Sequence, residues 1–222
     1  MLKNILTQQE VYIHKTIHYM KTLKEYIVEG LLDRVKNKEV NHEDLIRDYL
    51  KNNYACKQNN YNIEVIDGKY IVNVDGNIML KNRKVKHLTN GLFEFGEVKG
   101  DFMVSSCDII DFIGGPKEVY NGDLSIQFCD DLESLEGCPK IVYNSFEIHN
   151  CPNLKSFEGA PEEIKWGFYC RGCYNITKLK GFPKKVGSNC VFTTPHFDIN
   201  DIKRICKAEY YEITKPLNFI KI

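Results

Sequence analysis

Four cysteines recur at a constant interval and constrain this chain more than any other feature of its sequence. They are Cys107, Cys129, Cys151 and Cys173, and the residue number rises by the same amount, twenty-two, at every step. Around each lies the same pattern: an apolar-x-apolar run, two variable residues, the cysteine, apolar residues three and six positions later, and a Gly-x-Pro step, with one residue fewer in the first copy. Self-similarity at one period predicts a solenoid, in which successive coils of the chain stack on one another.

The pattern within one repeat predicts a short strand followed by a turn. Side chains alternate across a strand, so an apolar-x-apolar run points two side chains inward and one outward. Strands of successive coils should form one parallel sheet, roughly 4.8 Å apart. The cysteine falls where the strand turns away, and a small, readily buried thiol at that point predicts a ladder along the core. A further apolar residue follows each proline by three: Val119, Val142, Ile164 and Val186.

The segments that flank the repeats have the character of caps. In residues 61–80, apolar and polar residues alternate around two Asp-Gly pairs, which predicts a hairpin or a meander. The stretch "FDINDIKRICKAEYYEI" predicts a short helix capped by Asp198 or Asn200, and then a final strand. The predicted organisation is a helical segment over 1–60 and a repeat domain over 61–222, divided into an N-terminal β cap (61–96), repeats (97–197) and a C-terminal cap (198–222).

Residues 1–60 differ in kind from the rest of the chain. Thr7 to Glu10 forms a capping box, and a second helix start lies at Asn41 to Asp44. A helical stripe follows the capping box: Val11, Ile17, Met20, Leu23, Ile27 and Leu31. The predicted class is therefore α+β, with N-terminal helices followed by a capped solenoid that contains a parallel β-sheet. The N-terminal helix either packs on the solenoid or pairs with a partner chain.

Composition excludes several classes of protein. Thirty basic and thirty acidic side chains cancel, so nucleic acid or an anionic membrane would need a local patch to bind. Nine cysteines, an odd number that is spread along the chain, favour reduced thiols over a disulfide framework. The sequence has neither the apolar core of a signal peptide nor a membrane-spanning run. We expect a soluble protein that no signal peptide exports.

Two constellations suggest chemistry, and the repeat register explains both. Cys170 and Cys173 form a CxxC pair, which is typical of zinc or redox sites. However, Cys170 occupies an inward strand position and Cys173 belongs to the ladder, so no metal or cofactor is predicted. Glu147 and His149 lie two apart on a strand and face outward together. An open sheet supplies neither a deep pocket nor a nucleophile, so catalysis is not expected.

The outward strand positions are better candidates for binding a partner. Tyrosine and arginine, which often anchor interfaces, occur there. The residues predicted to contact a partner are Gln127, Phe128, Glu147, His149, Tyr169 and Arg171. Trp166, on the loop that enters the fourth strand, is a contact candidate if it is exposed. The lysines of the last repeat are interpreted as a solvated charged face: Lys178, Lys180, Lys184 and Lys185.

The repeats resemble the leucine-rich repeat family, in the version that carries cysteine where many members have asparagine. "SLEGCPKIVYNSF" and "SFEGAPEEIKWGF" are similar to the units of short leucine-rich-repeat proteins from tailed phages and their bacterial hosts. The resemblance covers residues 97–197. It implies a non-enzymatic module that binds a protein, either a virion component or a host factor, in the host cytoplasm or in the virion. The oligomeric state does not follow from the sequence.

A second resemblance concerns residues 20–30. "MKTLKEYIVEG" is similar to the capsid-targeting peptide of internal head proteins in phages of the T-even type. It implies cleavage between Glu29 and Gly30, although residues 1–19 precede Met20 whereas the family's peptide is N-terminal. The alternative is an ordinary amphipathic helix. Two further functions stay open: a purely structural virion or internal head protein anchored by its N-terminal helix, and a zinc-dependent nucleic-acid binder or enzyme.

Overall fold

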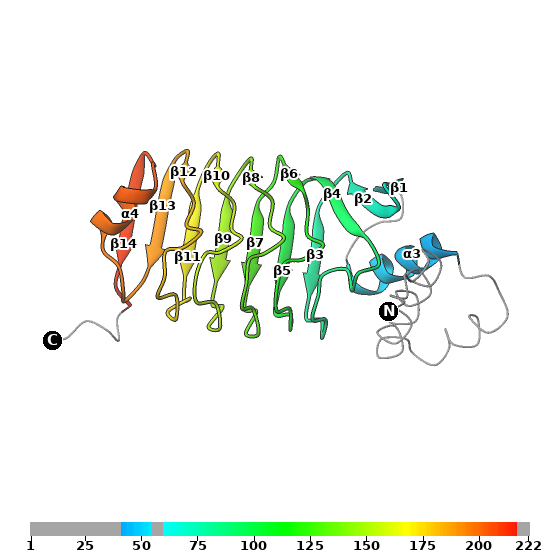
Figure 1. Ribbon diagram of the computed structural model, residues 1–222, viewed down its shortest axis with the longest axis horizontal. Helices are drawn as coiled ribbons and strands as arrows, with labels where there is room; N and C mark the ends of the chain where they lie inside the picture. The colour runs from blue at the N-terminus through cyan, green and yellow to red at the C-terminus, as the bar shows by residue number, and fades with distance from the viewer. Residues whose placement is uncertain (1–40, 55–59, 217–222) are drawn as a thin grey trace, which may run out of the picture. The chain divides into compact units, whose positions relative to one another are not determined.

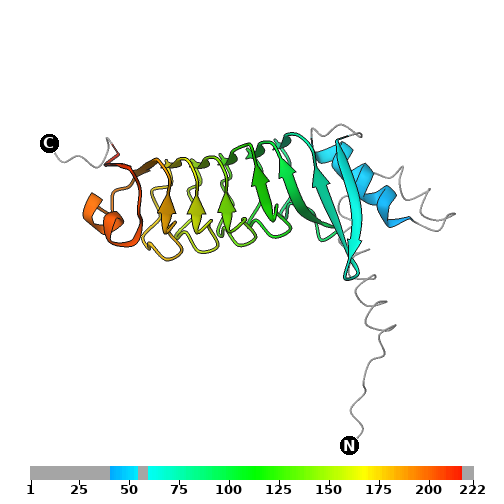
Figure 2. The same ribbon diagram turned by 90° about the horizontal axis from the view of Figure 1, so that it is seen from above.

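The computed structural model describes residues 41–54 and 60–216. Residues 60–216 wind into a parallel β-solenoid, in which successive coils lie side by side (Figures 1 and 2). Each full coil contributes a strand to two sheets of seven strands each, which we call sheet A and sheet B. The solenoid predicted from the cysteine spacing is therefore confirmed.

Sheet A contains the strands predicted from the repeats and is parallel throughout. Its strands are β3 (Ile78–Lys81), β5 (Phe102–Ser105), β7 (Leu124–Gln127), β9 (Phe146–His149), β11 (Phe168–Arg171), β13 (Asn189–Thr193) and β14 (Tyr210–Thr214). Sheet B lies on the other side of each coil. Its strands are β1 (Tyr61–Ile66), β2 (Lys69–Val74), β4 (Glu94–Lys99), β6 (Glu118–Tyr120), β8 (Ile141–Val142), β10 (Glu163–Ile164) and β12 (Lys185–Val186).

The four evenly spaced cysteines form the predicted ladder. All four side chains are at most 2% exposed. Each thiol approaches the carbonyl oxygen two residues before it, as in the 3.2 Å contact from Cys107 to Ser105 and the 3.4 Å contact from Cys129 to Gln127. The contact with Cys151 and burial raise the pKa of Cys129 well above its ordinary value. The ladder is thus a row of neutral thiols that fills the corner where each strand of sheet A ends.

The core lies between the two sheets and is rich in phenylalanine. Leu132 and Leu135, three and six residues after a ladder cysteine, are fully buried. In the C-terminal coils the ring of Phe157 meets those of Phe182 and Phe192 at centroid distances of 4.9 and 5.4 Å. Edge-to-face contacts of this kind favour aromatic packing beyond the area they bury.

The glycine of each Gly-x-Pro step is required by the close approach of neighbouring coils. Gly137 has φ +98°, and a Cβ atom there would lie 2.1 Å from the carbonyl oxygen of Phe112 in the preceding coil. Gly181 repeats the situation with φ +80° and a 2.2 Å approach to the oxygen of Phe157. A side chain at either position would meet backbone that cannot move aside. The repeat therefore needs glycine for space as well as for backbone conformation.

Sheet B differs from the expectation of a single parallel sheet. The apolar residue that follows each proline by three lies in this second sheet, where Val142, Ile164 and Val186 are buried. Strands β8, β10 and β12 have two residues each. Each of these strands has only one inward side chain, so the sequence shows no alternation there. The repeated apolar residue could therefore be recognised, but the strand around it could not.

The N-terminal side of the solenoid begins with a hairpin. Strands β1 and β2 pair antiparallel around Asp67 and Gly68, whose φ angles of 51° and 75° suit a tight hairpin turn. The meander alternative is wrong, because β3 leaves the hairpin and pairs parallel with β5 in sheet A. Winding of the coils thus starts inside residues 61–96, the segment predicted as a cap.

The C-terminal side closes as predicted, with a short helix and a last strand. Helix α4 (Ile199–Ile205) begins at Asp198, whose side chain accepts from the backbone N–H groups of Asn200 and Asp201 in a capping box. Ile202 of α4 is fully buried. Strand β14 then pairs parallel with β13 and extends sheet A.

Helix α3 (His42–Asn53) corresponds to the helix start predicted at Asn41 to Asp44. Ile46 and Leu50 are fully buried, and the hydroxyl of Tyr54 donates to the carbonyl of Leu88 at 2.6 Å. The earlier helix predicted from Thr7 onward, and the cleavage site predicted between Glu29 and Gly30, lie outside the described residues.

Candidate partner-binding face

The outward side of sheet A brings five of the six predicted contact residues together. The register sets Ser125, Glu147 and Tyr169 side by side on β7, β9 and β11. Two residues further along the same strands, Gln127, His149 and Arg171 form a second row. Neighbouring strands are about 4.8 Å apart, so these six side chains form one continuous patch, in which Ser125 is only 3% exposed. We call these six residues, together with Phe128, the recognition face.

Side chains on the recognition face pair along each strand. The amide of Gln127 donates to the hydroxyl of Ser125 at 2.8 Å. His149 Nε2 lies 3.7 Å from a carboxylate oxygen of Glu147, an ion-pair distance. Contact with the His149 ring lowers the pKa of Glu147 despite partial burial, and the charge of Arg171 adds to the effect.

Tyr169 is fixed by contacts on three sides. The guanidinium of Arg171 lies 6.0 Å from the centroid of its ring, and Asn189 donates an amide hydrogen bond to its hydroxyl at 3.4 Å. A Cβ atom at Gly167 would lie 2.5 Å from the ring, so the tyrosine leans over this glycine. The aromatic side chain is therefore held in place before any partner arrives.

Phe128 lies at the end of β7 and has an unusual backbone. Its φ is 53°, and its side chain is 51% exposed. Equivalent positions in other coils have the same left-handed conformation: Asn82, Ser106, Asn150 and Gly172. Those are the small or amide residues that tolerate this region, whereas a bulky aromatic there is uncommon. Backbone hydrogen bonds between coils, such as the 2.9 Å bond from Phe128 N–H to the carbonyl of His149, hold the conformation.

Sequence reasoning missed part of this face. Asn189, which orients Tyr169, lies on β13 and belongs to no motif. Met79 and Lys81 of β3 continue the two rows beyond Met103 and Ser105 of β5, with which they pair. The spacing in residue number between paired positions of β3 and β5 is two residues longer than the twenty-two-residue repeat, as the pairing of Met79 with Met103 shows. An alignment at the constant period could not include β3.

The CxxC residues belong to the core. Cys170 and Cys173 are at most 1% exposed, and Cys170 pairs in register with Ile148 and Phe192. Within residues 41–54 and 60–216, no group of three or more histidine, cysteine or acidic side chains could hold a metal ion. Eight cysteines in these ranges are free thiols and buried.

The lysines of the last repeat are mostly paired with carboxylates of the preceding coil. Lys180 approaches Glu158 at 2.6 Å, and Lys185 approaches Glu163 at 2.7 Å. This fits the interpretation as a solvated charged face. Trp166, in contrast, is 57% exposed on the loop between β10 and β11, which makes it a contact candidate.

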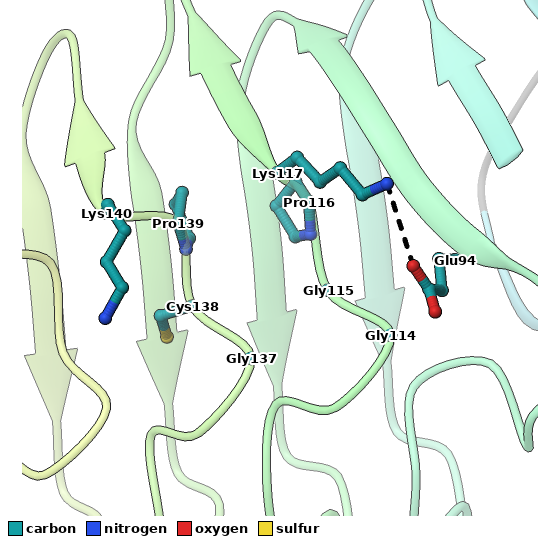
Figure 3. Close-up of a pocket in the computed structure, with 9 residues that line it drawn as sticks. All are labelled: Glu94, Gly114, Gly115, Pro116, Lys117, Gly137, Cys138, Pro139 and Lys140. Atoms are coloured by element: carbon teal, nitrogen blue, oxygen red, sulfur yellow. Dashed lines mark ion pairs between the residues drawn. The ribbon is translucent and has the colours of Figure 1, made fainter.

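An open groove of about 390 Å³ lies beside two successive Gly-x-Pro steps (Figure 3). Prolines and lysines from both steps line it, and Lys117 reaches Glu94 at 3.7 Å. Burial raises the pKa of the Cys138 thiol in its wall, so that thiol is a poor nucleophile. The lining therefore provides no nucleophile activated by a base.

None of the helices in the described ranges is both long enough and apolar enough to cross a lipid bilayer. Comparison of the chain with protein-family models, curated protein sequences and solved structures gave no match.

Proposed function

We propose that this protein is a non-enzymatic binding module of the leucine-rich-repeat type, which captures another protein through the recognition face. The observation that carries the proposal is Phe128. An L-residue in the left-handed region costs about 1–2 kcal/mol, and a buried aromatic side chain would offset that cost. Because half of the Phe128 side chain is exposed, the free protein realises only about half of that burial gain. Such local strain is typical of functional sites.

The neighbouring side chains suit a protein partner better than a polyanion. Glu147 interacts with both His149 and Arg171, so the patch carries both signs of charge. Phosphate groups would be repelled by that carboxylate. The fixed ring of Tyr169 and the exposed ring of Phe128 provide apolar area of the kind that anchors protein interfaces.

The repeat units support a leucine-rich-repeat identity and a phage or prophage setting, with a virion component or a host factor as the partner. Residues 20–30 support processing during head assembly. If that proposal holds, mass spectrometry of the protein recovered from virions should find a chain that begins at Gly30. A chain that retains Met1 in mature virions would contradict the processing.

Capture experiments test the recognition face. Wild-type protein should recover a partner from infected-cell lysate or dissociated virions. A Tyr169→Ala, Arg171→Ala double variant and a Phe128→Asn variant should lose it. Asparagine occupies the equivalent position at Asn82 and Asn150, so Phe128→Asn should not weaken the fold. The matched control is Ile113→Asn, which removes an equally exposed apolar side chain away from sheet A.

The outcomes separate the candidate functions. Loss of the partner with the two recognition-face changes but not with Ile113→Asn supports the proposal. Equal recovery with all four proteins would contradict it. Failure of every protein, wild type included, to recover a partner would favour a purely structural role.

A further inference from the structure

Charge is distributed unevenly along the solenoid, although the whole chain is neutral. Residues 60–136 contain 7 lysines and arginines against 14 acidic residues, a net charge of −7 with histidine neutral. Residues 137–216 contain 12 against 8, a net charge of +4. An elongated surface with opposite charge in its two halves is complementary to a second copy of itself that runs in the reverse direction.

The outward side of sheet B shows this reversal residue by residue. Inward residues of its strands, such as Val98 and Val119, are fully buried, so the residues on either side of them face outward. Strand pairing defines a first outward row, in coil order: Glu97, Glu118, Ile141, Glu163, Lys185 and Lys207. The second row lies two residues further along: Lys99, Tyr120, Tyr143, Lys165, Gly187 and Glu209.

We propose that the outward side of sheet B is a homodimer interface, with a two-fold axis that runs parallel to the strands between β8 and β10. This axis reverses the order of the coils and keeps each row opposite itself. In the first row Glu97 then faces Lys207, and Glu118 faces Lys185. In the second row Lys99 faces Glu209 of the other copy. The other in-plane two-fold, which keeps the coil order, would instead set the first row against the second and leave Glu118 and Lys185 opposite Tyr120 and Gly187.

Of the groups that face an opposite charge in the proposed dimer, all but Lys185 lack an ion pair with the described residues of their own copy. Inner carboxylates are already shared, as Glu163 is between Lys165 at 2.8 Å and Lys185 at 2.7 Å. By contrast, Glu97 and Lys207 form no ion pair with any residue that the structure describes, and the same holds for Lys99 and Glu209.

Glu118 also lacks a partner for one of its oxygens. Its Oε2 atom is buried and has no hydrogen-bond partner among the described residues. A buried acceptor without a partner is costly. In the proposed dimer Lys185 of the second copy lies opposite this carboxylate.

Exposed aromatic rings lie next to the proposed axis. Tyr143, which follows β8, is 41% exposed and stacks on Tyr120 at a centroid distance of 4.6 Å. Trp166, which follows β10, is 57% exposed. Aromatic anchors near the centre of an interface, surrounded by charged pairs, are the arrangement that stable protein interfaces use.

Charge-reversal variants of the full chain test the dimer by sedimentation equilibrium. Wild-type protein should dimerise, and raising NaCl from about 0.05 M to about 0.5 M should weaken the dimer by screening. The double variants Glu97→Lys, Glu118→Lys and Lys185→Glu, Lys207→Glu should each raise the dissociation constant at least about 100-fold, since like charges then face each other. Mixed together, the two variants should form a heterodimer, because every reversed charge meets a reversed partner.

Two controls show whether any loss of the dimer comes from this interface. Lys155→Glu, Lys178→Glu changes lysines to glutamates at exposed positions outside sheet B and should leave the dimer intact. Thermal unfolding checks that the variants fold; if Glu118→Lys does not, Glu97→Lys is mixed with Lys207→Glu instead. A monomeric wild type at all accessible concentrations overturns the proposal. An oligomer whose dissociation constant does not change with the charge reversals also overturns the proposal. A mixture of folded variants that stays monomeric overturns it as well. The recognition face is not involved, so partner capture should survive the loss of the dimer.

Discussion

At the residue scale, the distance to the next coil decides which side chain each position accepts. The ladder corner holds a thiol because it is small and apolar. Gly137 holds no side chain at all, because a Cβ atom would lie 2.1 Å from the backbone of Phe112. A positive φ also occurs at Gly91, where a Cβ atom would meet nothing within 4 Å. Comparing Gly137 with Gly91 therefore separates the effect of backbone conformation from the effect of steric contact.

We therefore expect Gly137→Ala to destabilise the fold more than Gly91→Ala. Both changes place alanine in the left-handed region, at a cost of about 1 kcal/mol. Gly137→Ala adds a clash with backbone, which should cost roughly 2 kcal/mol more. Urea unfolding of the two variants measures the difference. Equal losses of stability would mean that the coils do not approach each other as closely at Gly137 as described.

Glu147 should make stability depend on pH. Its pKa in the folded protein lies below the ordinary 4.5, so its contribution is present above that value and is lost as the pH falls through the lowered pKa. Glu147→Gln should lower the urea midpoint at pH 6, and the difference from wild type should vanish toward pH 3. A difference for Glu147→Gln that is constant with pH would contradict this account.

At the element scale, the sequence predicts the strands that obey the constant period and misses those that do not. Strands β5, β7, β9 and β11 follow from the cysteine alignment. Strand β3 lies outside that period, since Ile78 pairs with Phe102, and β8, β10 and β12 are too short to alternate. The recognition face was predictable as two rows, since register follows from the period. The contacts that fix Tyr169 depend on side-chain conformation, which no period encodes.

The C-terminal cap supplies a prediction at this scale. Asp198 accepts backbone hydrogen bonds at the start of α4. Asp198→Ala should destabilise the protein by about 1 kcal/mol, whereas Asp198→Asn keeps a good capping side chain and should cost much less. Hydrogen exchange should show the Asp198→Ala loss first in α4 and β14. Equal exchange in both variants would argue that the cap contributes nothing.

At the scale of the whole molecule, the stacking of similar coils creates two outward sheet faces that differ in the residues they expose. Sheet A presents a pre-arranged polar and aromatic patch, and sheet B presents opposite charges in its two halves. In a dimer through sheet B the two recognition faces would point away from each other, which would let one dimer hold two partners. Both proposals depend on the register that the buried cysteines define.

Alkylation of native protein, followed by mass spectrometry, tests most directly whether these cysteines are buried between stacked coils. The account predicts that Cys107, Cys129, Cys151 and Cys173 react only as fast as the whole solenoid unfolds, all four at one rate, and react fully in urea. Rapid modification of any of the four in the native protein would contradict the stacked coils.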